Sequence, residues 1–144
     1  MTSFDGLTVL FLGDLNHDSN SYSRLKAFRA LGARVLDYSH TPVCEEDGTR
    51  IAPTFNFRIA WKLGFHLDAE KANQWLLQTA LRETPALIWI EKGNMIKPCV
   101  LRQLRTHCPE AIFASDTDDD MHRWSNRTWA YTHGLRHYDF VFTT

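Results

Sequence analysis

The sequence is poor in the features that mark secreted and membrane proteins. Its three cysteines, Cys44, Cys99 and Cys108, are odd in number and lack C-x-x-C spacing, a pattern typical of free thiols in a reducing compartment. No apolar run approaches the ~18–20 residues that a membrane-spanning helix needs. The first ten residues contain Asp5 and no basic stretch, which is not the pattern of a signal peptide. We therefore expect a cytoplasmic protein without a membrane span.

The sequence also lacks an excess of one charge and the common cofactor motifs. Sixteen Lys and Arg residues stand against 17 Asp and Glu residues, for a net charge of −1. Without a basic stripe to neutralise phosphates, nucleic-acid binding is disfavoured. Neither G-x-G-x-x-G nor a P-loop lysine follows the first apolar run. The seven histidines form no H-x-x-x-H or Cys/His set, so we expect no cofactor and no zinc site.

Short apolar segments alternate with segments of helical periodicity along the 144 residues. This alternation predicts one Rossmann-like α/β domain over residues 1–144, with three αβα layers and a parallel sheet. We expect the five-stranded sheet to have the order 2-1-3-4-5. The predicted strands are 7–12, 33–38, 86–90, 111–114 and 138–143.

Turn and capping residues separate these segments. Ser19 or Asn20 is expected to cap a helix whose apolar stripe is Tyr22, Leu25, Phe28 and Leu31. Asp68 is expected to cap a later helix and Ser125 the last one, whereas Pro98 suits a first helical turn.

The segment 55–65 has helical spacing but is apolar on two faces. Phe55, Ile59 and Leu63 lie on one face and Phe57, Trp61 and Phe65 on the other. A helix of this kind needs two packing partners. We therefore expect Phe57, Trp61 or Phe65 to form an exposed patch, covered by a second domain or by a second copy of the chain.

Ligands of such sheets bind beyond the carboxyl ends of the strands, where the strand order reverses. In the predicted order this point lies between the first and third strands. The polar residues that follow strands one, three and four, and that we expect to converge there, are Asp14, Asn16, Ser19, Lys92, Gly93, Asp116 and Asp119.

Each of these groups has a functional and a purely structural interpretation. Asp14, Asn16 and Ser19 either bind a ligand beside a helix N-terminus or only form a turn and a cap. Lys92 either reaches into the cleft or forms a surface salt bridge. Gly93 either lets a substrate approach the backbone or only forms a turn. The D-x-D beginning at Asp116 could hold a divalent metal, supply a general base, or be a solvated acidic loop.

Three stretches together resemble the amino-terminal region of CgeB-type (spore-maturation) glycosyltransferases. They are Phe11–Asp14 with Ser19–Arg24, then Leu87–Gly93, and finally Tyr138–Thr144. The acidic run after the fourth strand is also similar to a short Asp-Asp segment of that family. The likeness extends over essentially the whole chain, and its specificity lies in the combination rather than in any one stretch.

The resemblance implies a GT-B architecture, in which two Rossmann-like domains face each other across a cleft. The carboxyl-terminal domain generally binds the nucleotide-sugar donor, and the amino-terminal domain receives the acceptor. The chain ends at Thr144, where the second domain would follow, so we expect this half to be inactive alone. Asp14 or Asp119 would be the base that takes the acceptor proton. Asn16, Ser19, Lys92, Gly93 and Asp116 would contact a carbohydrate or other hydroxyl acceptor.

A non-catalytic interaction module is the alternative from another functional class. A phosphoacceptor receiver domain shares the strand order, but it would need paired acids after strand one and a phosphoacceptor Asp after strand three. The chain has Asp14 alone and then Glu91-Lys92 at those places. The aromatic residues Phe57, Trp61 and Phe65 would instead suit partner binding.

Overall fold

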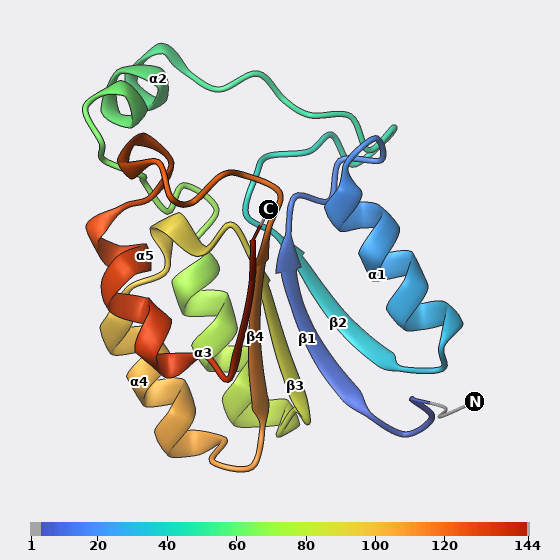
Figure 1. Ribbon diagram of the computed structural model, residues 1–144. Helices are drawn as coiled ribbons and strands as arrows, with labels where there is room; N and C mark the ends of the chain where they lie inside the picture. Colours follow the sequence, from blue (N-terminus) through green and yellow to red (C-terminus); the bar gives the residue numbers. More distant parts are fainter. Residues whose placement is uncertain (1–3, 144) are drawn as a thin grey trace.

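Five parallel strands form a single sheet in the order β2-β1-β3-β4-β5, which confirms the predicted order (Figure 1). The computed structural model of the chain describes residues 4–143, so Thr144 of the third resembling stretch lies outside the described residues. Leu10 lies opposite Leu36 on one side and Ile88 on the other. The strands are β1 (Thr8–Gly13), β2 (Arg34–Ser39), β3 (Leu87–Glu91), β4 (Ile112–Thr117) and β5 (Phe140–Thr143).

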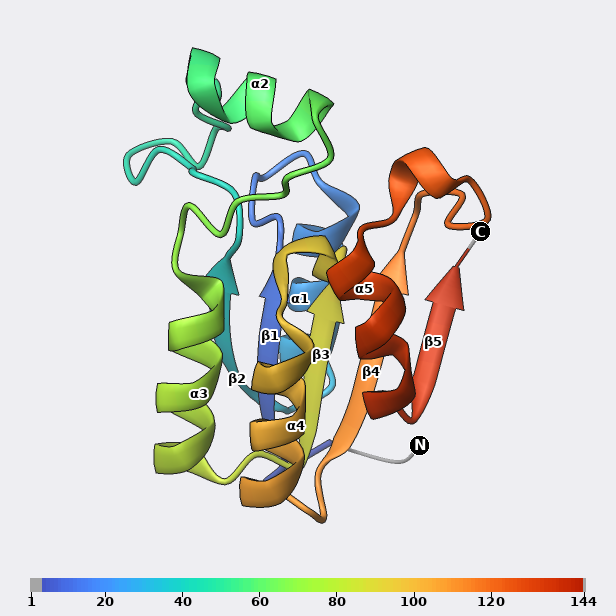
Figure 2. The same ribbon diagram turned by 90° about the vertical axis from the view of Figure 1, so that its left-hand side faces the viewer.

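Helices on both faces of the sheet complete the three expected layers. Helix α1 (Asn20–Ala30) lies on one face, and α3 (Ala72–Glu83), α4 (Pro98–His107) and α5 (Trp129–Gly134) lie on the other (Figures 1 and 2). The two-turn helix α2 (Phe55–Lys62) stands beyond the carboxyl edge of the sheet. Single 3-10 turns cover Gly93–Met95, Trp124–Asn126 and Leu135–His137.

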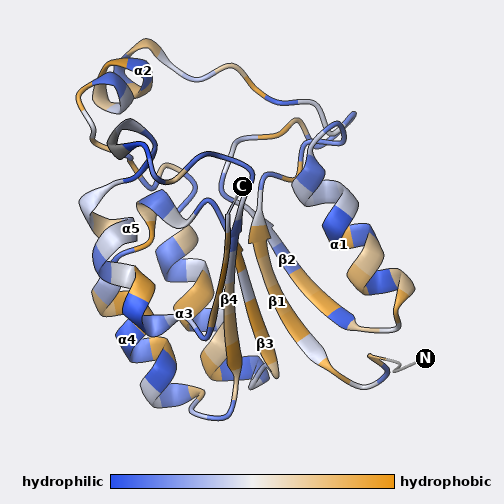
Figure 3. Cartoon of the chain, in the orientation of Figure 1, coloured by the Kyte–Doolittle hydropathy of each residue, from blue (hydrophilic) through white to orange (hydrophobic). Residues whose placement is uncertain are grey.

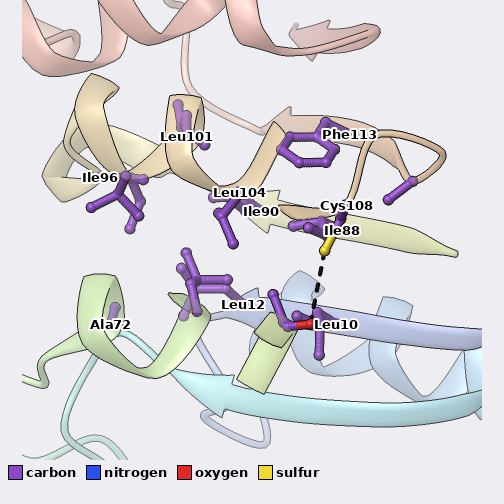
Figure 4. Packing of buried hydrophobic residues seen from close by; sticks show 14 residues of the cluster. Leu10, Leu12, Ala72, Ile88, Ile90, Ile96, Leu101, Leu104, Cys108 and Phe113 are labelled. Atoms are coloured by element: carbon purple, nitrogen blue, oxygen red, sulfur yellow. Dashed lines mark hydrogen bonds between the residues drawn. The ribbon is translucent and has the colours of Figure 1, made fainter. Parts of the chain in front are cut away.

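The larger core lies between the sheet and the layer of α3 and α4. Leu10 and Leu12 of β1 and Ile88 and Ile90 of β3 point to this side and are fully buried (Figure 4). Figure 3 shows the same concentration of hydrophobic residues along the strands. Cys108 lies in this core, where its Sγ donates to the carbonyl of Ala80 at 3.8 Å. Burial raises the pKa of this thiol, which marks it as a packing residue rather than a nucleophile.

The opposite face is only partly covered. Helix α1 packs on β1 and β2, and Phe28 contacts Phe11 and Trp89 edge to face, with ring centroids 6.0 and 5.3 Å apart. Trp89 in turn stacks on Phe142 of β5 at 5.8 Å. Phe140 and Phe142 stay exposed, since no described helix covers this side of β4 and β5 (Figure 1).

Three expectations about local structure need correction. Of the predicted α1 stripe only Leu25 is fully buried, whereas Phe28 packs on Phe11 and Trp89 but stays partly exposed. Strand β4 continues to Thr117, so Asp116 is a strand residue and not part of a loop. Thr128 caps α5 by accepting from the amide of Tyr131 at 3.1 Å, whereas Ser125 lies in the preceding 3-10 turn.

The start of α3 is held by a buried polar network. Asp68 accepts from the amides of Ala72 at 2.6 Å and Asn73 at 3.0 Å, as predicted for a capping residue. The side chain of Asn73 donates to Asp68 at 2.7 Å and to the Met95 carbonyl at 2.9 Å. Its oxygen accepts from the Lys97 amide at 2.9 Å. Asn73 thereby ties the start of α3 to the turn that leads into α4.

We predict that Asn73→Ala lowers the free energy of unfolding by about 2 kcal/mol, because it leaves buried donors and acceptors without partners. Gln74→Ala, at an exposed position of the same helix, should change it by less than about 0.5 kcal/mol. Urea unfolding of both variants measures the difference. Equal free energies of unfolding for the two variants would show that the Asn73 network does not stabilise the fold.

Candidate functional site

The loop after β1 is closed by its own side chains. Ser19 caps α1 by accepting from the amide of Tyr22 at 3.0 Å, and its hydroxyl donates to the carbonyl of Asp14. The amide of Asn16 donates to the Asp14 carboxylate at 3.1 Å, and the Asn16 side chain accepts from the Asp18 amide at 3.4 Å. Asn16 therefore shapes the loop, and Asp14 is held at the start of it.

Asp14 is fixed by two residues of the segment that follows β2. Thr41 Oγ1 donates to its carboxylate at 2.7 Å, and Arg50 forms an ion pair with it. Burial pushes the pKa of Asp14 upward, but the bonds from Thr41 and the Asn16 amide, with the charge of Arg50, hold it below its ordinary value. Asp14 is therefore a carboxylate at neutral pH.

A tight hairpin brings Arg50 to this position. The amide of Cys44 donates to the Thr49 carbonyl at 2.8 Å, and Val43 pairs with Arg50. Gly48 at the turn has φ +67°, a backbone conformation that favours glycine, and its missing Cβ leaves room for the ring of His17. The hairpin thus carries a guanidinium across the carboxyl edge of the sheet.

A cavity of about 530 Å³ lies beyond the carboxyl ends of β1, β2 and β3, under the segment that contains α2. This is the place where the strand order reverses, at which ligands of open α/β sheets bind. Asp14, Ser19 and Lys92 contribute to its polar wall. The apolar wall comes from the loop before α2 and from α2 itself, and includes Ile51, Pro53, Phe57, Trp61 and Leu67.

His40 also lines this cavity, and both of its ring nitrogens are buried without a hydrogen-bond partner among the described residues. Burial of the ring lowers the pKa of His40 to about 4; the charge of Asp14 opposes this shift, and the charges of Lys92 and Arg50 add to it. The imidazole is therefore neutral at pH 7.

The turn after β3 contributes Lys92 and Gly93. Lys92 adopts φ +48° and its ammonium pairs with Asp119 at 3.0 Å. Asp119 thus adjoins the cavity through Lys92 without lining it. Gly93 is buried, and a Cβ at this position would lie 3.2 Å from the hydroxyl of Tyr138 and 3.3 Å from Ile90. The space that this glycine leaves is filled by packing, and its role in ligand binding stays a prediction.

Arg24 of α1 forms ion pairs with three carboxylates, which lie at or just beyond the carboxyl ends of β3 and β4. Its guanidinium lies 3.2 Å from Glu91, 2.9 Å from Asp116 and 2.6 Å from Asp118. Asp116, expected at the acceptor site, therefore faces α1 and lines a different hollow with Trp89 and Phe142. Burial raises the pKa of Asp116, with Arg24 opposing and Asp118 adding to the rise.

Glu91 is the buried member of this group, with 3% of its surface exposed. Its carboxylate accepts from the hydroxyl of Ser21, from Trp89 Nε1 at 3.0 Å and from Arg24. Burial raises the pKa of Glu91, and these three partners counter the rise. Glu91 lies at a strand end, as the sequence pattern indicates, whereas Arg24 lies within α1 and was not expected at the site.

The expected residues thus separate into two groups. Asp14, Ser19 and Lys92 line the cavity, and Asp119 adjoins it, whereas Asn16, Gly93 and Asp116 do not line it. His40, Thr41 and Arg50 were missed, because the sequence shows only a loop between the second strand and the next helix there. Within residues 4–143, no three His, Cys, Asp or Glu side chains are arranged to hold a metal ion. No helix in the same range is long and apolar enough to cross a bilayer.

Comparison with known proteins identifies no family for this chain: no family model matches it, and no curated protein has a significantly similar sequence.

We predict that Arg24→Met lowers the free energy of unfolding by about 2–4 kcal/mol, because it leaves Glu91 buried with an uncompensated charge. Adding Glu91→Gln should restore much of the loss. Arg29→Met, which breaks only the more exposed pair with Asp37, should cost less than about 1 kcal/mol. Denaturant unfolding at pH 7 tests the set, and a double variant no more stable than Arg24→Met would refute the coupling.

We also predict a pH dependence from His40. Its folded pKa of about 4 lies below the value of 6.5 for a free histidine, so the unfolded chain binds the proton first as the pH falls through 6.5. His40 should therefore remove up to about 3 kcal/mol of stability between pH 7 and pH 4. The slope should flatten in His40→Gln and persist in His122→Gln. If the NMR signal of the His40 imidazole titrated near 6.5 in the folded protein, the prediction would be contradicted.

Proposed function

We propose that the cavity receives the acceptor in a glycosyl transfer and that the chain is the acceptor-side domain of a GT-B glycosyltransferase. The observation that supports this proposal is the composition of the cavity at the strand-order reversal. Its polar wall of carboxylate, hydroxyl and ammonium groups faces an aromatic wall. The resemblance of three sequence stretches to CgeB-type enzymes points to the same function.

A sugar ring suits such a cavity because its edge carries hydroxyl groups and its face carries C–H groups. Asp14 and Lys92 offer an acceptor and a donor to the hydroxyls, and the side chains of Ser19 and Asn20 lie beside them at the start of α1. Phe57 and Trp61, whose rings stack 6.1 Å apart, offer an apolar surface to the face of the ring. A few placed polar groups in an apolar pocket are typical of small-molecule sites.

Asp14 is the best-placed base for this reaction. In the transfer, the acceptor oxygen forms a bond to the anomeric carbon, the nucleoside diphosphate leaves, and a carboxylate takes the hydroxyl proton. Asp14 lines the cavity and is ionised at neutral pH. Its hydrogen bond from Thr41 and ion pair with Arg50 orient it. Asp119 is the second candidate, and its proximity to Lys92 sets it at the edge of the same cavity.

The proposal predicts that the isolated chain binds acceptor-type carbohydrates and no nucleotide sugar. We would titrate the ¹⁵N-labelled chain with a panel of mono- and disaccharides and with uridine, guanosine and thymidine diphosphosugars. Amide shifts of Asp14, Ser19 and Lys92 are expected with at least one free sugar. Asp14→Asn should weaken that binding by about tenfold, because a hydrogen bond to a charged group is lost. Asp37→Asn, remote from the cavity in β2, should not.

Two outcomes would contradict the proposal. Micromolar binding of a diphosphosugar in the cavity would identify the chain as a donor-binding domain instead. If no carbohydrate shifts the amide signals of the cavity residues, the result would favour the alternative of a non-catalytic interaction module. The specific observation that favours this alternative is the exposed aromatic surface of β5 and α2, where Phe55, Phe65 and Phe140 are each more than half exposed.

A further inference from the structure

The segment that roofs the cavity has an unusual surface for a part of a folded domain. We call residues 49–67, which contain α2, the hood. None of the residues of α2 is buried, and no helix or strand described in residues 4–143 packs closely on it. Phe55 is 74% and Leu63 68% exposed. Exposed apolar surface of this extent usually marks an interaction site.

The two faces of α2 differ in what they contact. Phe57, Arg58, Trp61 and Lys62 line the cavity. By helical spacing the opposite face carries Phe55, Ile59 and Leu63, all of them exposed, and Phe65 just after the helix is exposed as well. Figures 1 and 2 show the helix standing clear of the sheet, beyond its carboxyl edge. The apolar outer face is therefore accessible to a large partner.

The charge of the hood identifies the kind of partner. Arg50, Arg58 and Lys62 are its charged residues, and the sequence has no Asp or Glu between Asp47 and Asp68. Arg50 is paired with Asp14, but Arg58 and Lys62 are exposed and form no ion pair with any residue of 4–143. A chain of net charge −1 thus concentrates positive charge on its most apolar projection. The complementary partner is a surface that is both anionic and apolar beneath.

We propose that the hood docks on the surface of an anionic lipid bilayer. Phe and Trp side chains beside Lys and Arg on a short helix are the composition of interfacial segments, which bury an apolar face while their cations contact lipid headgroups. The helix is already formed, with Thr54 accepting from the Phe57 amide at 3.3 Å, so docking orders little new backbone. The proposal stands independently of glycosyl transfer.

Vesicle flotation with the whole chain tests this inference. We expect binding to phosphatidylcholine vesicles that contain about 30% phosphatidylserine, little binding to phosphatidylcholine alone, and a decrease as salt rises, because the Debye length shortens. Phe55→Ser and Leu63→Ser should each lower the partition coefficient about tenfold. The double variant Arg58→Gln/Lys62→Gln should lower it by more than tenfold, at about fivefold for each cation.

Matched substitutions elsewhere serve as controls. Leu81→Ser removes a comparably exposed leucine from the far end of α3, and Arg102→Gln/Arg136→Gln removes two exposed cations away from the hood. Both controls should bind vesicles like the parent, and all variants should unfold at the parent temperature because the substituted residues are exposed. The inference is overturned if the parent ignores anionic vesicles at low salt, or if the hood variants bind as the controls do. It is also overturned if Phe55→Ser abolishes self-association in sedimentation while the parent binds no vesicle, which would identify a second copy as the partner.

Discussion

The buried carboxylate of Glu91 is the constraint on which the carboxyl edge of the sheet depends. A charge at the end of a central strand is costly unless it is paired and hydrogen-bonded. Ser21 and Arg24 of α1 satisfy it together with Trp89, so the first turns of α1 are fixed against β3. Arg24 then extends this constraint to Asp116 and Asp118, and the ends of β3 and β4 become parts of one ionic cluster.

This cluster also determines which charges are available to a ligand. Arg24 pairs with three carboxylates, and two of them, Glu91 and Asp118, also line the cavity, so their negative charge is compensated there. Within the cavity, Asp14 is matched by Arg50 and Lys92 by Asp119. The neutral ring of His40, with its unsatisfied nitrogens, lies between these pairs. The groups at the strand ends are thus polar and matched in charge, and Arg58 and Lys62 of α2 add positive charge to the cavity wall.

The periodic part of the fold could be predicted from the sequence, and the contacts between distant loops could not. Buried parallel strands appear as short apolar runs, and Ser19 and Pro98 mark helix starts through local rules. The pairing of Asp14 with Arg50 depends on a hairpin whose register no local pattern specifies. The Arg24 cluster joins residues almost a hundred positions apart. Ser125 and Thr128 are equally good caps by composition, and packing of Tyr131 and Gly134 against the body selects Thr128.

Residues 55–65 are apolar on two faces, which is not the pattern of a helix that packs on a domain with one face. A helix of eight residues is marginal in isolation, since nucleation fixes several residues for few hydrogen bonds. In α2 the cap at Thr54 and the left-handed Gly64, with φ +83°, supply local support, but no buried side chain adds to it. Stability on the cavity side is limited to the contacts of Phe57 and Trp61. The helical spacing nevertheless places Phe55, Ile59 and Leu63 on the outer side, where they are exposed and no described helix or strand packs closely on them.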